Sequence, residues 1–387
     1  MRILVEGSGG TAGWPQPGCR CASCLRQTAA GNTRKKSTIV VDERLRLGPG
    51  AADEEAGKAG WEAGVTGGEA AVTGGEAGDG GGEAGYRVRW VPDLRDGGAG
   101  GWDVTAPDGG RLLYPAGPGG QGSAPAPPEG SAPYDVAFLD LLGDPAQLGW
   151  LRARGLITAG TVTAVAFADH RVPSEAELAR RCGFWRVRLA GDGEAIDPAR
   201  SVPKDRDVTG GTRRVLVLGG ARSGKSERAE LRLAGEPDVT YVATGSVAGD
   251  PDWAARVAAH RARRPAWWRT AETTDLAGLL GRARGALLID GIGTWLAAVL
   301  DECGWELRDD AARDKLAARI ADLVGAWRQA RCHVVAVSDE TGLGVVPATP
   351  AGRLFRDELG RLNQALAAES EEAELVVAGR VLSLGEW

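Results

Sequence analysis

The sequence predicts an α/β protein whose C-terminal half contains a parallel β-sheet of the P-loop NTPase type. Two observations predict this class. After about Thr212, short apolar segments alternate with segments that have the periodicity of amphipathic helices, a pattern typical of a parallel sheet covered on both faces. Directly after the first apolar segment, residues 219–226 read GGARSGKS, the Gly-rich pattern that surrounds phosphate groups. A second domain of ordinary size precedes this half.

The C-terminal half, residues 212–387, is predicted to contain strands and helices in regular alternation. The largely apolar segments expected to form strands are 214–219, 239–244, 286–292, 333–339 and 373–379. The segments expected to form helices are 226–235, 251–264, about 308–330 and about 352–369. Strands that are apolar at every position are expected to be buried on both faces.

The N-terminal half, residues 1–200, is less regular. Its predicted strands are 1–5, 38–42, 86–91, 135–141 and 162–167, and its predicted helices are 145–154 and 174–182. The phrase GGEA recurs three times within residues 49–85, and so little apolar surface with so much glycine predicts a mobile loop. A second Gly- and Pro-rich stretch covers 115–133, and polar residues 201–211 are predicted to be a linker.

Composition and charge exclude several classes of protein. The 387 residues carry a formal net charge of −6, whereas a general nucleic-acid binder carries a basic excess. No apolar run is long enough to cross a membrane, and the first residues, MRILVEGSGG, lack the pattern of a signal peptide. A cytoplasmic protein without a membrane span or nucleic-acid partner is therefore expected.

The loop after strand 214–219 is predicted to bind a nucleoside triphosphate. Its glycines would let successive backbone N–H groups surround phosphate oxygens, and the following helix would add its partial positive charge. Lys225 is expected to reach the β- and γ-phosphates, and the Ser226 hydroxyl to hold Mg²⁺. The whole candidate loop is Gly219, Gly220, Ala221, Arg222, Ser223, Gly224, Lys225 and Ser226. The alternative is a Gly-rich turn between strand and helix with a chance lysine.

An acidic partner for Mg²⁺ is expected at the end of another apolar strand. Asp290 closes the apolar run ALLID and is the best candidate. The alternative is that Asp290 caps the helix that follows.

His260 lies in a basic segment, RVAAHRARRP. On a helix, Arg256 and Arg264 would share its face, and nearby cations favour the neutral, nucleophilic imidazole. A neutral histidine beside a bound nucleotide could attack the α-phosphorus and form a phosphoramidate. The alternative is a solvated basic helix end in which the histidine has no role.

The C-terminal half resembles the bifunctional adenosylcobinamide kinase / adenosylcobinamide-phosphate guanylyltransferase family of cobalamin biosynthesis. The resemblance covers nearly all of residues 213–387. Its segments, in order, are GGARSGKSERAE from Gly219, YVATG from Tyr241, RVAAHRARRPAWWRTAE from Arg256, LLIDGIGTWL from Leu287 and SDETGLGVVPATPAGRLFRDELGRLNQALA from Ser338.

This resemblance implies two reactions at one nucleotide site. The aminopropanol hydroxyl of adenosylcobinamide is phosphorylated by ATP or GTP, and GMP is then transferred from GTP through a histidine-bound intermediate, giving adenosylcobinamide-GDP and pyrophosphate. It implies His260 as the guanylylated residue, a trimeric assembly and a set of nucleotide contacts outside the loop: Ala243, Thr244, Gly245, Arg261, Ala262, Arg263, Arg264, Glu272 and Asp290.

One segment departs from the family pattern. After Asp290 the family usually has Cys-Leu-Thr, where this sequence has Gly291, Ile292 and Gly293. Ala298 also replaces an asparagine. The lost polar groups could alter contacts with Mg²⁺ or substrate.

The N-terminal half resembles metallo-β-lactamase-fold proteins of the phosphodiesterase-like branch, which carry a Cys-x-Cys-x-x-Cys insert. The resemblance rests on GSGGTAGWPQPGCRCASC, from Gly7, on TIVVD, from Thr38, and on VTAPDGGRLLY and AFADHRVPSEAELARR further along. The motif H-x-H-x-D-H is absent, and His170 is the first histidine of the chain. We therefore expect a degenerate domain of the αβ/βα type without hydrolase activity.

The clustered cysteines are expected to bind zinc. Cys19, Cys21 and Cys24 lie within six residues, and the resemblance implies His170 as a fourth ligand. Cys₃His is an ordinary closed zinc site. The alternative is three reduced cysteines in a surface loop.

Three functions therefore remain open. The chain could be the bifunctional enzyme, a small-molecule kinase that lacks the transferase step, or a non-catalytic nucleotide-binding regulator. His260 separates the first two, and Lys225 with Asp290 separates the third.

Overall fold

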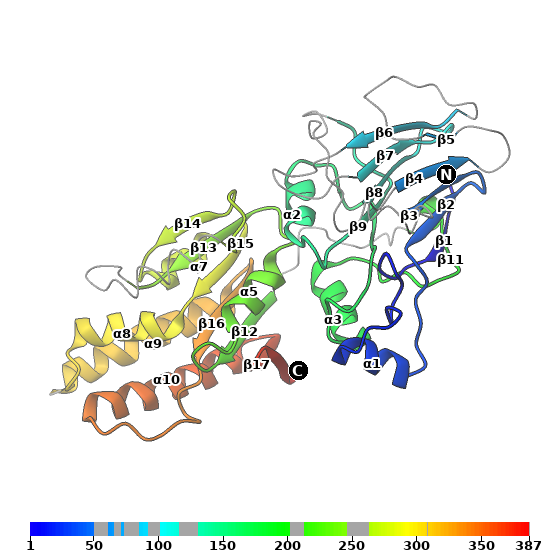
Figure 1. Ribbon diagram of the computed structural model, residues 1–387. Helices are drawn as coiled ribbons and strands as arrows, with labels where there is room; N and C mark the ends of the chain where they lie inside the picture. Colours follow the sequence, from blue (N-terminus) through cyan, green and yellow to red (C-terminus); the bar gives the residue numbers. More distant parts are fainter. Residues whose placement is uncertain are drawn as a thin grey trace. The chain divides into compact units, whose positions relative to one another are not determined.

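The computed structural model describes residues 1–49, 61–65, 71–72, 85–91, 101–115, 131–201, 213–245, 263–307 and 309–386 (Figure 1). The chain divides into two compact units. The N-terminal unit comprises Met1–Val208 with Ala234–Pro237, and the C-terminal unit comprises Thr209–Leu233 with Asp238–Trp387. Each unit has its own sheets and its own core, so each is described by itself.

The N-terminal unit contains two β-sheets. A six-stranded antiparallel sheet has the order β11-β1-β2-β3-β4-β5. Its strands are β1 (Ile3–Gly7), β2 (Thr38–Val41), β3 (Leu45–Pro49), β4 (Trp61–Val65), β5 (Ala71–Val72) and β11 (Glu194–Ile196). A five-stranded mixed sheet has the order β10-β9-β8-β7-β6. Its strands are β6 (Arg87–Val91), β7 (Gly101–Thr105), β8 (Arg111–Pro115), β9 (Val136–Leu139) and β10 (Val162–Val165).

One hydrophobic core joins these two sheets. Alternate residues of β1 and β2, such as Ile3 and Ile39, pack in the same cluster as Leu112 and Phe138 of the mixed sheet. Alternation arises because successive side chains of a strand point to opposite faces. In the described part of this unit the helices are α1 (Ala22–Ala29), α2 (Ala146–Ala153), α3 (Glu175–Trp185) and α4 (Pro198–Ser201).

The elements predicted in this half are confirmed, and one predicted loop is corrected. Helices α2 and α3 and strands β1, β2, β6, β9 and β10 match the predicted segments within a few residues. The prediction of a loop over all of 49–85 was wrong in part, because β4 and β5 lie inside it. Backbone pairing does not require apolar side chains, so a Gly- and Glu-rich composition hides such strands. Most of the second Gly- and Pro-rich stretch lies outside the described residues.

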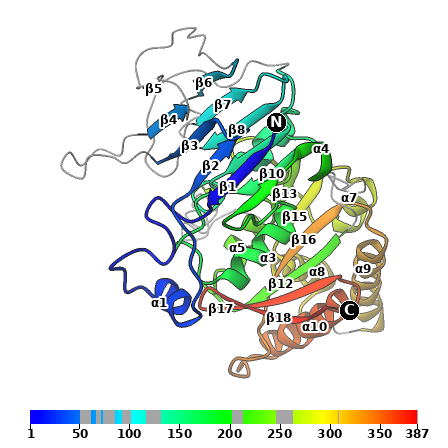
Figure 2. The same cartoon turned by 90° about the vertical axis from the view of Figure 1, so that its right-hand side faces the viewer.

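The C-terminal unit is built on a seven-stranded sheet with the order β14-β13-β15-β16-β12-β17-β18. Its strands are β12 (Arg213–Gly219), β13 (Val239–Ala243), β14 (Arg269–Glu272), β15 (Ala286–Asp290), β16 (His333–Asp339), β17 (Glu372–Val377) and β18 (Arg380–Glu386). All neighbouring strands are parallel except β18, which is antiparallel to β17. Figure 2 shows these strands running side by side.

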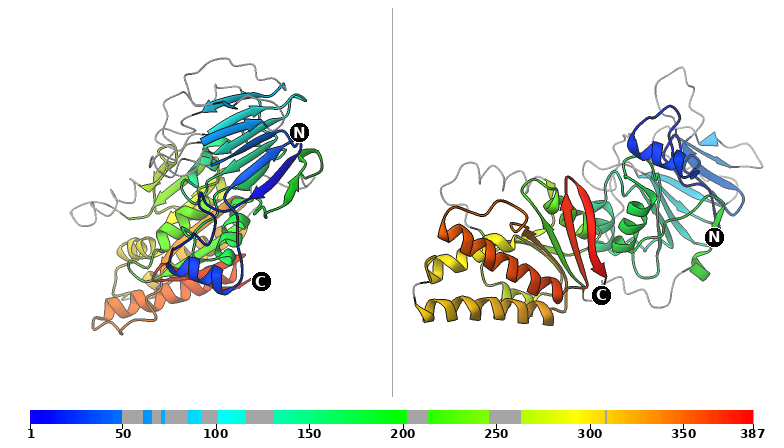
Figure 3. Two further views of the ribbon diagram at one scale, coloured as in Figure 1. Left: turned by 45° about the vertical axis from the view of Figure 1, so that its right-hand side comes forward. Right: turned by 90° about the horizontal axis from the view of Figure 1, so that it is seen from below.

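Helices cover both faces of this sheet. Helices α7 (Leu276–Arg282), α8 (Ile292–Cys303), α9 (Asp310–Gln329) and α10 (Pro350–Ala368) contribute to one core together with Leu216 and Ala336. Helix α5 (Lys225–Leu233) packs on the opposite core with Val215 and Val335. Figure 3 shows α9 in yellow and α10 in orange lying beside each other. The prediction of a parallel sheet covered on both faces is confirmed.

A buried charge cluster fixes helix α5 to the sheet. The guanidinium groups of Arg228 and Arg232 on α5 contact the Glu374 carboxylate of β17 at 2.7 Å. The side chains of Arg228 and Glu374 are each 4% exposed, and that of Arg232 is 1% exposed. Buried charges are tolerated when they are paired and hydrogen-bonded. This cluster holds the helix that begins directly after the predicted phosphate loop.

Sequence reasoning missed four elements of the C-terminal unit: β14, α7, α8 and β18. The edge strands β14 and β18 are half-exposed or exposed and lack an apolar run. The predicted helix 251–264 lies, apart from its last two residues, outside the described residues. None of the described helices is long and apolar enough to span a bilayer.

Candidate functional site

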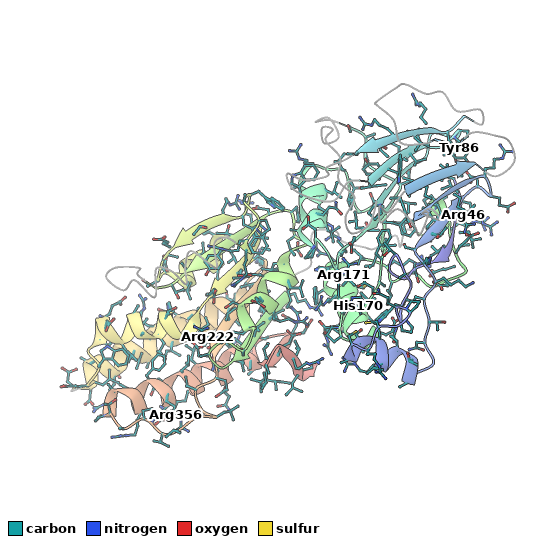
Figure 4. All side chains as sticks on the ribbon, viewed as in Figure 1. Arg46, Tyr86, His170, Arg171, Arg222 and Arg356 are labelled. Atoms are coloured by element: carbon teal, nitrogen blue, oxygen red, sulfur yellow. The ribbon has the colours of Figure 1, made fainter. Side chains whose placement is uncertain are left out.

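The phosphate loop turns sharply between strand β12 and helix α5. Arg222 has φ +57° and Gly224 has φ +95°, and such left-handed residues make successive N–H groups point into one concavity. At Gly219, a Cβ atom would lie 2.4 Å from Ser223 Oγ and 2.8 Å from Val376 O. Only glycine therefore fits there. Figure 4 shows Arg222 at this turn.

Lys225, the first residue of α5, points across the loop. Its Nζ atom lies 2.9 Å from Asp339 Oδ1 and donates to Gly220 O at 3.2 Å. Asp339 is the last residue of β16, which lies between β12 and β15. Sequence reasoning assigned no role to Asp339, although its position at the end of a predicted strand, shortly after the apolar run VVAV, was a signal that could have found it.

Ser226 and Asp290, the two residues that the sequence predicts as Mg²⁺ contacts, lie within hydrogen-bond distance of each other. The Ser226 hydroxyl donates to Asp290 Oδ1 at 3.4 Å, and the Tyr241 hydroxyl donates to Asp290 Oδ2 at 3.0 Å. Burial, and after it the Asp290 carboxylate, raises the pKa of Tyr241 well above its usual value. The alternative role of Asp290 as a helix cap is not observed, because Gly291 is the N-cap residue of α8.

Three further predicted contacts lie at the same edge of the sheet. Strand register aligns Glu272 with Ala243, and Ala243 with Asp290. The Thr244 hydroxyl donates to Gly291 O at 2.6 Å and lies 2.5 Å from the Thr294 hydroxyl. Carboxyl ends of parallel strands form the usual ligand edge of an open α/β sheet. The residues predicted from several separate motifs are thus brought together.

Two of the predicted arginines also lie beside this edge. The Arg264 guanidinium lies 3.5 Å from the centre of the Tyr241 ring, a cation–π contact. Arg263 Nε contacts Glu230 of α5 at 3.2 Å. The remaining members of the basic segment, His260, Arg261 and Ala262, lie outside the described residues.

A second cluster lies in the N-terminal unit, where the structure gathers sulfur and nitrogen ligands. One ligand atom from each of Cys19, Cys24 and His170 lies within 4.8 Å of the others. Cys21 is the N-cap of α1, where its Sγ accepts from Cys24 N at 3.4 Å. Burial raises the pKa of the Cys24 thiol to about 11, whereas the backbone N–H of Cys24 lowers the pKa of Cys21. Two cysteines and one histidine at this separation fit a tetrahedral thiophilic metal.

Next to His170, Arg171 joins two carboxylates (Figure 4). Its Nη1 donates to Asp140 Oδ2 at 2.8 Å, and its Nε donates to Asp169 Oδ1 at 2.9 Å. Asp140 directly follows β9, and Asp169 lies just beyond β10, the parallel neighbour of β9. Burial raises the pKa of Asp140, although the hydrogen bond from Arg171 acts in the opposite direction.

Comparison with known proteins identifies relatives of the C-terminal half. Residues 215–384 match the family described as cobinamide kinase / cobinamide phosphate guanyltransferase. The bifunctional adenosylcobalamin biosynthesis protein CobP of Pseudomonas aeruginosa is 44% identical over 177 residues, which is 44% of this chain and 96% of that protein. The corresponding CobU proteins of Salmonella typhimurium and Escherichia coli are 40% and 37% identical, each over 43% of this chain and 96% of its own length.

Proposed function

The chain belongs to the cobinamide kinase / cobinamide phosphate guanyltransferase family, and we propose that it catalyses both reactions of this family. It phosphorylates adenosylcobinamide with ATP or GTP and then transfers GMP from GTP to the product, giving adenosylcobinamide-GDP. The observation that carries this proposal is the meeting of Lys225, Ser226 and Asp290 around one phosphate loop.

In the phosphorylation step, the loop N–H groups and Lys225 hold the β- and γ-phosphates. Ser226 and Asp290 supply the oxygen atoms that would hold Mg²⁺, which neutralises phosphate charge when bound. The acceptor hydroxyl attacks the γ-phosphorus, and the bond from this phosphorus to the bridging oxygen breaks. The protein's own contribution is alignment of the triphosphate and stabilisation of the charge that moves onto the leaving diphosphate.

In the transfer step, His260 is the nucleophile. Its ring nitrogen forms a bond to the α-phosphorus of GTP while the bond to pyrophosphate breaks. A phosphate oxygen of adenosylcobinamide phosphate then attacks the same phosphorus, and the bond to His260 breaks. Arg263 and Arg264, which lie at the edge of the nucleotide site, supply positive charge for the phosphates.

Labelling with α-³²P GTP tests this proposal. Wild-type protein should retain label after denaturing electrophoresis, and the label should be lost in acid but not in alkali. His260→Ala should abolish labelling without loss of nucleotide binding, whereas the control His170→Ala should be labelled normally. Undiminished labelling of His260→Ala contradicts the assignment of the nucleophile.

The same experiment separates the two alternative functions. Phosphorylation of adenosylcobinamide without any covalent label favours a kinase that lacks the transferase step. Nucleotide binding with neither label nor turnover favours a regulator. We also propose the trimeric assembly that the resemblance implies, and sedimentation of the purified chain tests it.

We also propose that the N-terminal unit is a degenerate metallo-β-lactamase-like domain with a structural zinc. Cys19, Cys24 and His170 already lie close together, and Cys21 supplies a third thiolate next to them in sequence. Zinc would stabilise the fold, since thiolate-bound zinc contributes directly to folding. The support for the domain assignment is the pair of sheets that share one core.

Metal analysis tests the zinc. Protein purified without chelator should contain one zinc per chain, Cys24→Ser should lose it, and the control Cys303→Ser should retain it. A truncated chain that starts near residue 206 should keep both cobinamide activities. Loss of activity in a truncated chain that still folds would show that the N-terminal unit takes part in catalysis.

A further inference from the structure

We infer that Asp339 is a catalytic residue of the phosphorylation step, in which its carboxylate binds the acceptor hydroxyl and accepts its proton. This inference rests on the proposed function, because it names the group that activates the acceptor. It concerns a residue that none of the predicted motifs singled out. Four observations support it: sheet position, contact with Lys225, backbone anchoring and space at Gly293.

The first observation is the position of Asp339 in the sheet. Strand β16 separates β12, which leads into the phosphate loop, from β15, which ends at Asp290. Register aligns Asp290 with Val337, so Asp339 lies two residues further toward the carboxyl edge. A triphosphate in the loop would extend along this edge. Asp339 is therefore beside the terminal phosphate, beyond the carboxylate assigned to Mg²⁺.

The second observation is that Asp339 contacts Lys225, the same lysine that would bind the triphosphate. Its side chain is 45% exposed and its carboxylate lies 2.9 Å from Lys225 Nζ. When the β- and γ-phosphates bind Lys225, they compete with Asp339 for the same ammonium group. The Asp339 carboxylate then lies on the γ-phosphate side of the site. Its oxygen atoms are available to accept a hydrogen bond from the hydroxyl of the substrate.

Neighbouring carboxylates have other partners. Asp290 accepts from the hydroxyls of Ser226 and Tyr241. Glu340 Oε1 accepts from Gly342 N at 2.8 Å, so this carboxylate is turned along its own loop. Among the described carboxylates at this edge, Asp339 is the one in contact with Lys225, so nucleotide binding would release it for an acceptor hydroxyl.

The third observation is that the backbone of Asp339 is anchored from α10. Asn363 Nδ2 donates to Asp339 O at 3.1 Å, and the Ser338 hydroxyl donates to Asn363 Oδ1 at 2.6 Å. Asn363 is 4% exposed. A carboxylate on a fixed backbone is preorganised for an incoming hydroxyl, which is what general base catalysis requires.

The fourth observation gives a physical reason for the glycine at position 293. A Cβ atom there would lie 3.1 Å from Asp339 Oδ2, which is tighter than ordinary van der Waals contact. The absence of a side chain at Gly293 therefore leaves room for the Asp339 carboxylate. Gly293, which departs from the family pattern, and the Asp339 carboxylate are therefore linked by the space that they share.

The acceptor oxygen forms a bond to the γ-phosphorus, and the bond from the γ-phosphorus to the bridging oxygen breaks. The nucleoside diphosphate leaves with the electron pair of that bond. The proton of the hydroxyl passes to Asp339, which releases it to solvent after the products leave.

The test measures the two reactions separately in Asp339→Asn, which has nearly the same shape but cannot accept the proton. We expect its kcat for phosphorylation of adenosylcobinamide to fall by roughly 100- to 10,000-fold, the usual range for loss of a general base, with little change in KM for the triphosphate. Transfer of GMP to preformed adenosylcobinamide phosphate should be retained. Asp339→Glu should recover part of the phosphorylation rate, and the control Glu340→Gln should have wild-type rates.

A second substitution tests the same arrangement without removing the carboxylate. Gly293→Thr should lower phosphorylation by crowding Asp339, and should cause little further loss in the Asp339→Asn background, since contacting residues are not additive. If Asp339→Asn loses both reactions equally and has a raised KM for the triphosphate, Asp339 acts only as a counter-ion of Lys225. That result would overturn the inference. Full activity of Asp339→Asn would overturn it too. An inactive wild-type chain would instead contradict the proposed function itself.

Discussion

Both units place carboxylates beside a cation at the ends of parallel strands. The two cations differ in whether a ligand can draw them away from those carboxylates. In the N-terminal unit, Arg171 contacts Asp140, Asp169 and Phe167 O through separate nitrogen atoms. In the C-terminal unit, Lys225 contacts Asp339 and Gly220 O through one ammonium group. The arginine is held by three partners from two segments, whereas the lysine can move to a ligand.

This difference explains why similar topology gives a closed cluster in one unit and an open site in the other. The planar guanidinium matches two carboxylates at once and stays charged at any ordinary pH. Lysine is a compact charge on a flexible stem, and Asp339, its partner, is 45% exposed. Convergence of parallel strands brings the charges together in both units, and the identity of the cation decides whether a ligand can enter.

The largest effect is expected at the buried cluster that holds helix α5. Glu374→Ala leaves two arginines buried without their carboxylate, and breaking a buried pair in this way costs about 3–5 kcal/mol. Denaturant unfolding should show this loss in the C-terminal unit alone. The control Glu358→Ala removes a pair whose Arg361 side chain is 69% exposed, and should cost about 0–1 kcal/mol. Equal effects of the two substitutions would contradict the role given to burial.

The next largest effect is expected on triphosphate affinity when Lys225, the cation that a ligand can displace, is removed. Lys225→Ala removes a charged contact to the β- and γ-phosphates, and such contacts contribute about 1.5–3 kcal/mol. Triphosphate affinity should therefore fall by about 10- to 150-fold, and both reactions should be impaired. Isothermal titration with a non-hydrolysable triphosphate measures this, with Lys315→Ala on the solvent side of α9 as control. Normal turnover of Lys225→Ala would mean that the phosphate site lies elsewhere.

A smaller effect is expected when the fixed cation is removed. Arg171→Met leaves Asp140 and Asp169 without their shared donor, which costs about 1–3 kcal/mol for a partly buried cluster. Because burial already raises the pKa of Asp140 in the folded chain, folding favours the protonated form of this carboxyl. The cost should therefore shrink as the pH falls from neutrality toward the ordinary aspartate pKa of 3.8. Urea unfolding at several pH values checks this, and a cost that grows in acid would contradict it.

The sequence predicted which residues would gather at the carboxyl edge of the sheet far better than it predicted the charge pairing around them. The spacing of GGARSGKS places Lys225 and Ser226 on consecutive positions of one helix, and the end of an apolar strand identified Asp290. The contact of Lys225 with Asp339 depends on the order of strands, with β16 inserted between β12 and β15, and no local pattern reveals that order.

The N-terminal unit shows the same limit. The cysteine spacing could be read directly, and the structure brings Cys19, Cys24 and His170 together. The contact of Arg171 with Asp140 joins residues 31 positions apart, so no short motif contains it. Strands β4 and β5 lie in Gly-rich segments whose pairing rests on the backbone, which composition does not report.

The smallest expected effect is the absence of hydrolysis by the N-terminal unit. The full chain, incubated with Mn²⁺, Zn²⁺ or Mg²⁺ and a phosphodiester or lactam substrate, should show no turnover above buffer. Metal-dependent hydrolysis needs a metal-bound water, and the carboxylates at the ends of β9 and β10 are already joined by Arg171. The first histidine of the chain, His170, lies with the cysteines instead. Arg171→Met exposes the same two carboxylates and should still be inactive, because the sequence lacks the H-x-H-x-D-H motif whose side chains would hold a dinuclear hydrolytic centre. Turnover that appears with added metal and is lost in Asp140→Asn would show that Arg171 does not keep a metal away from these carboxylates. Arg171 and Lys225 would then not differ in whether they let a ligand enter.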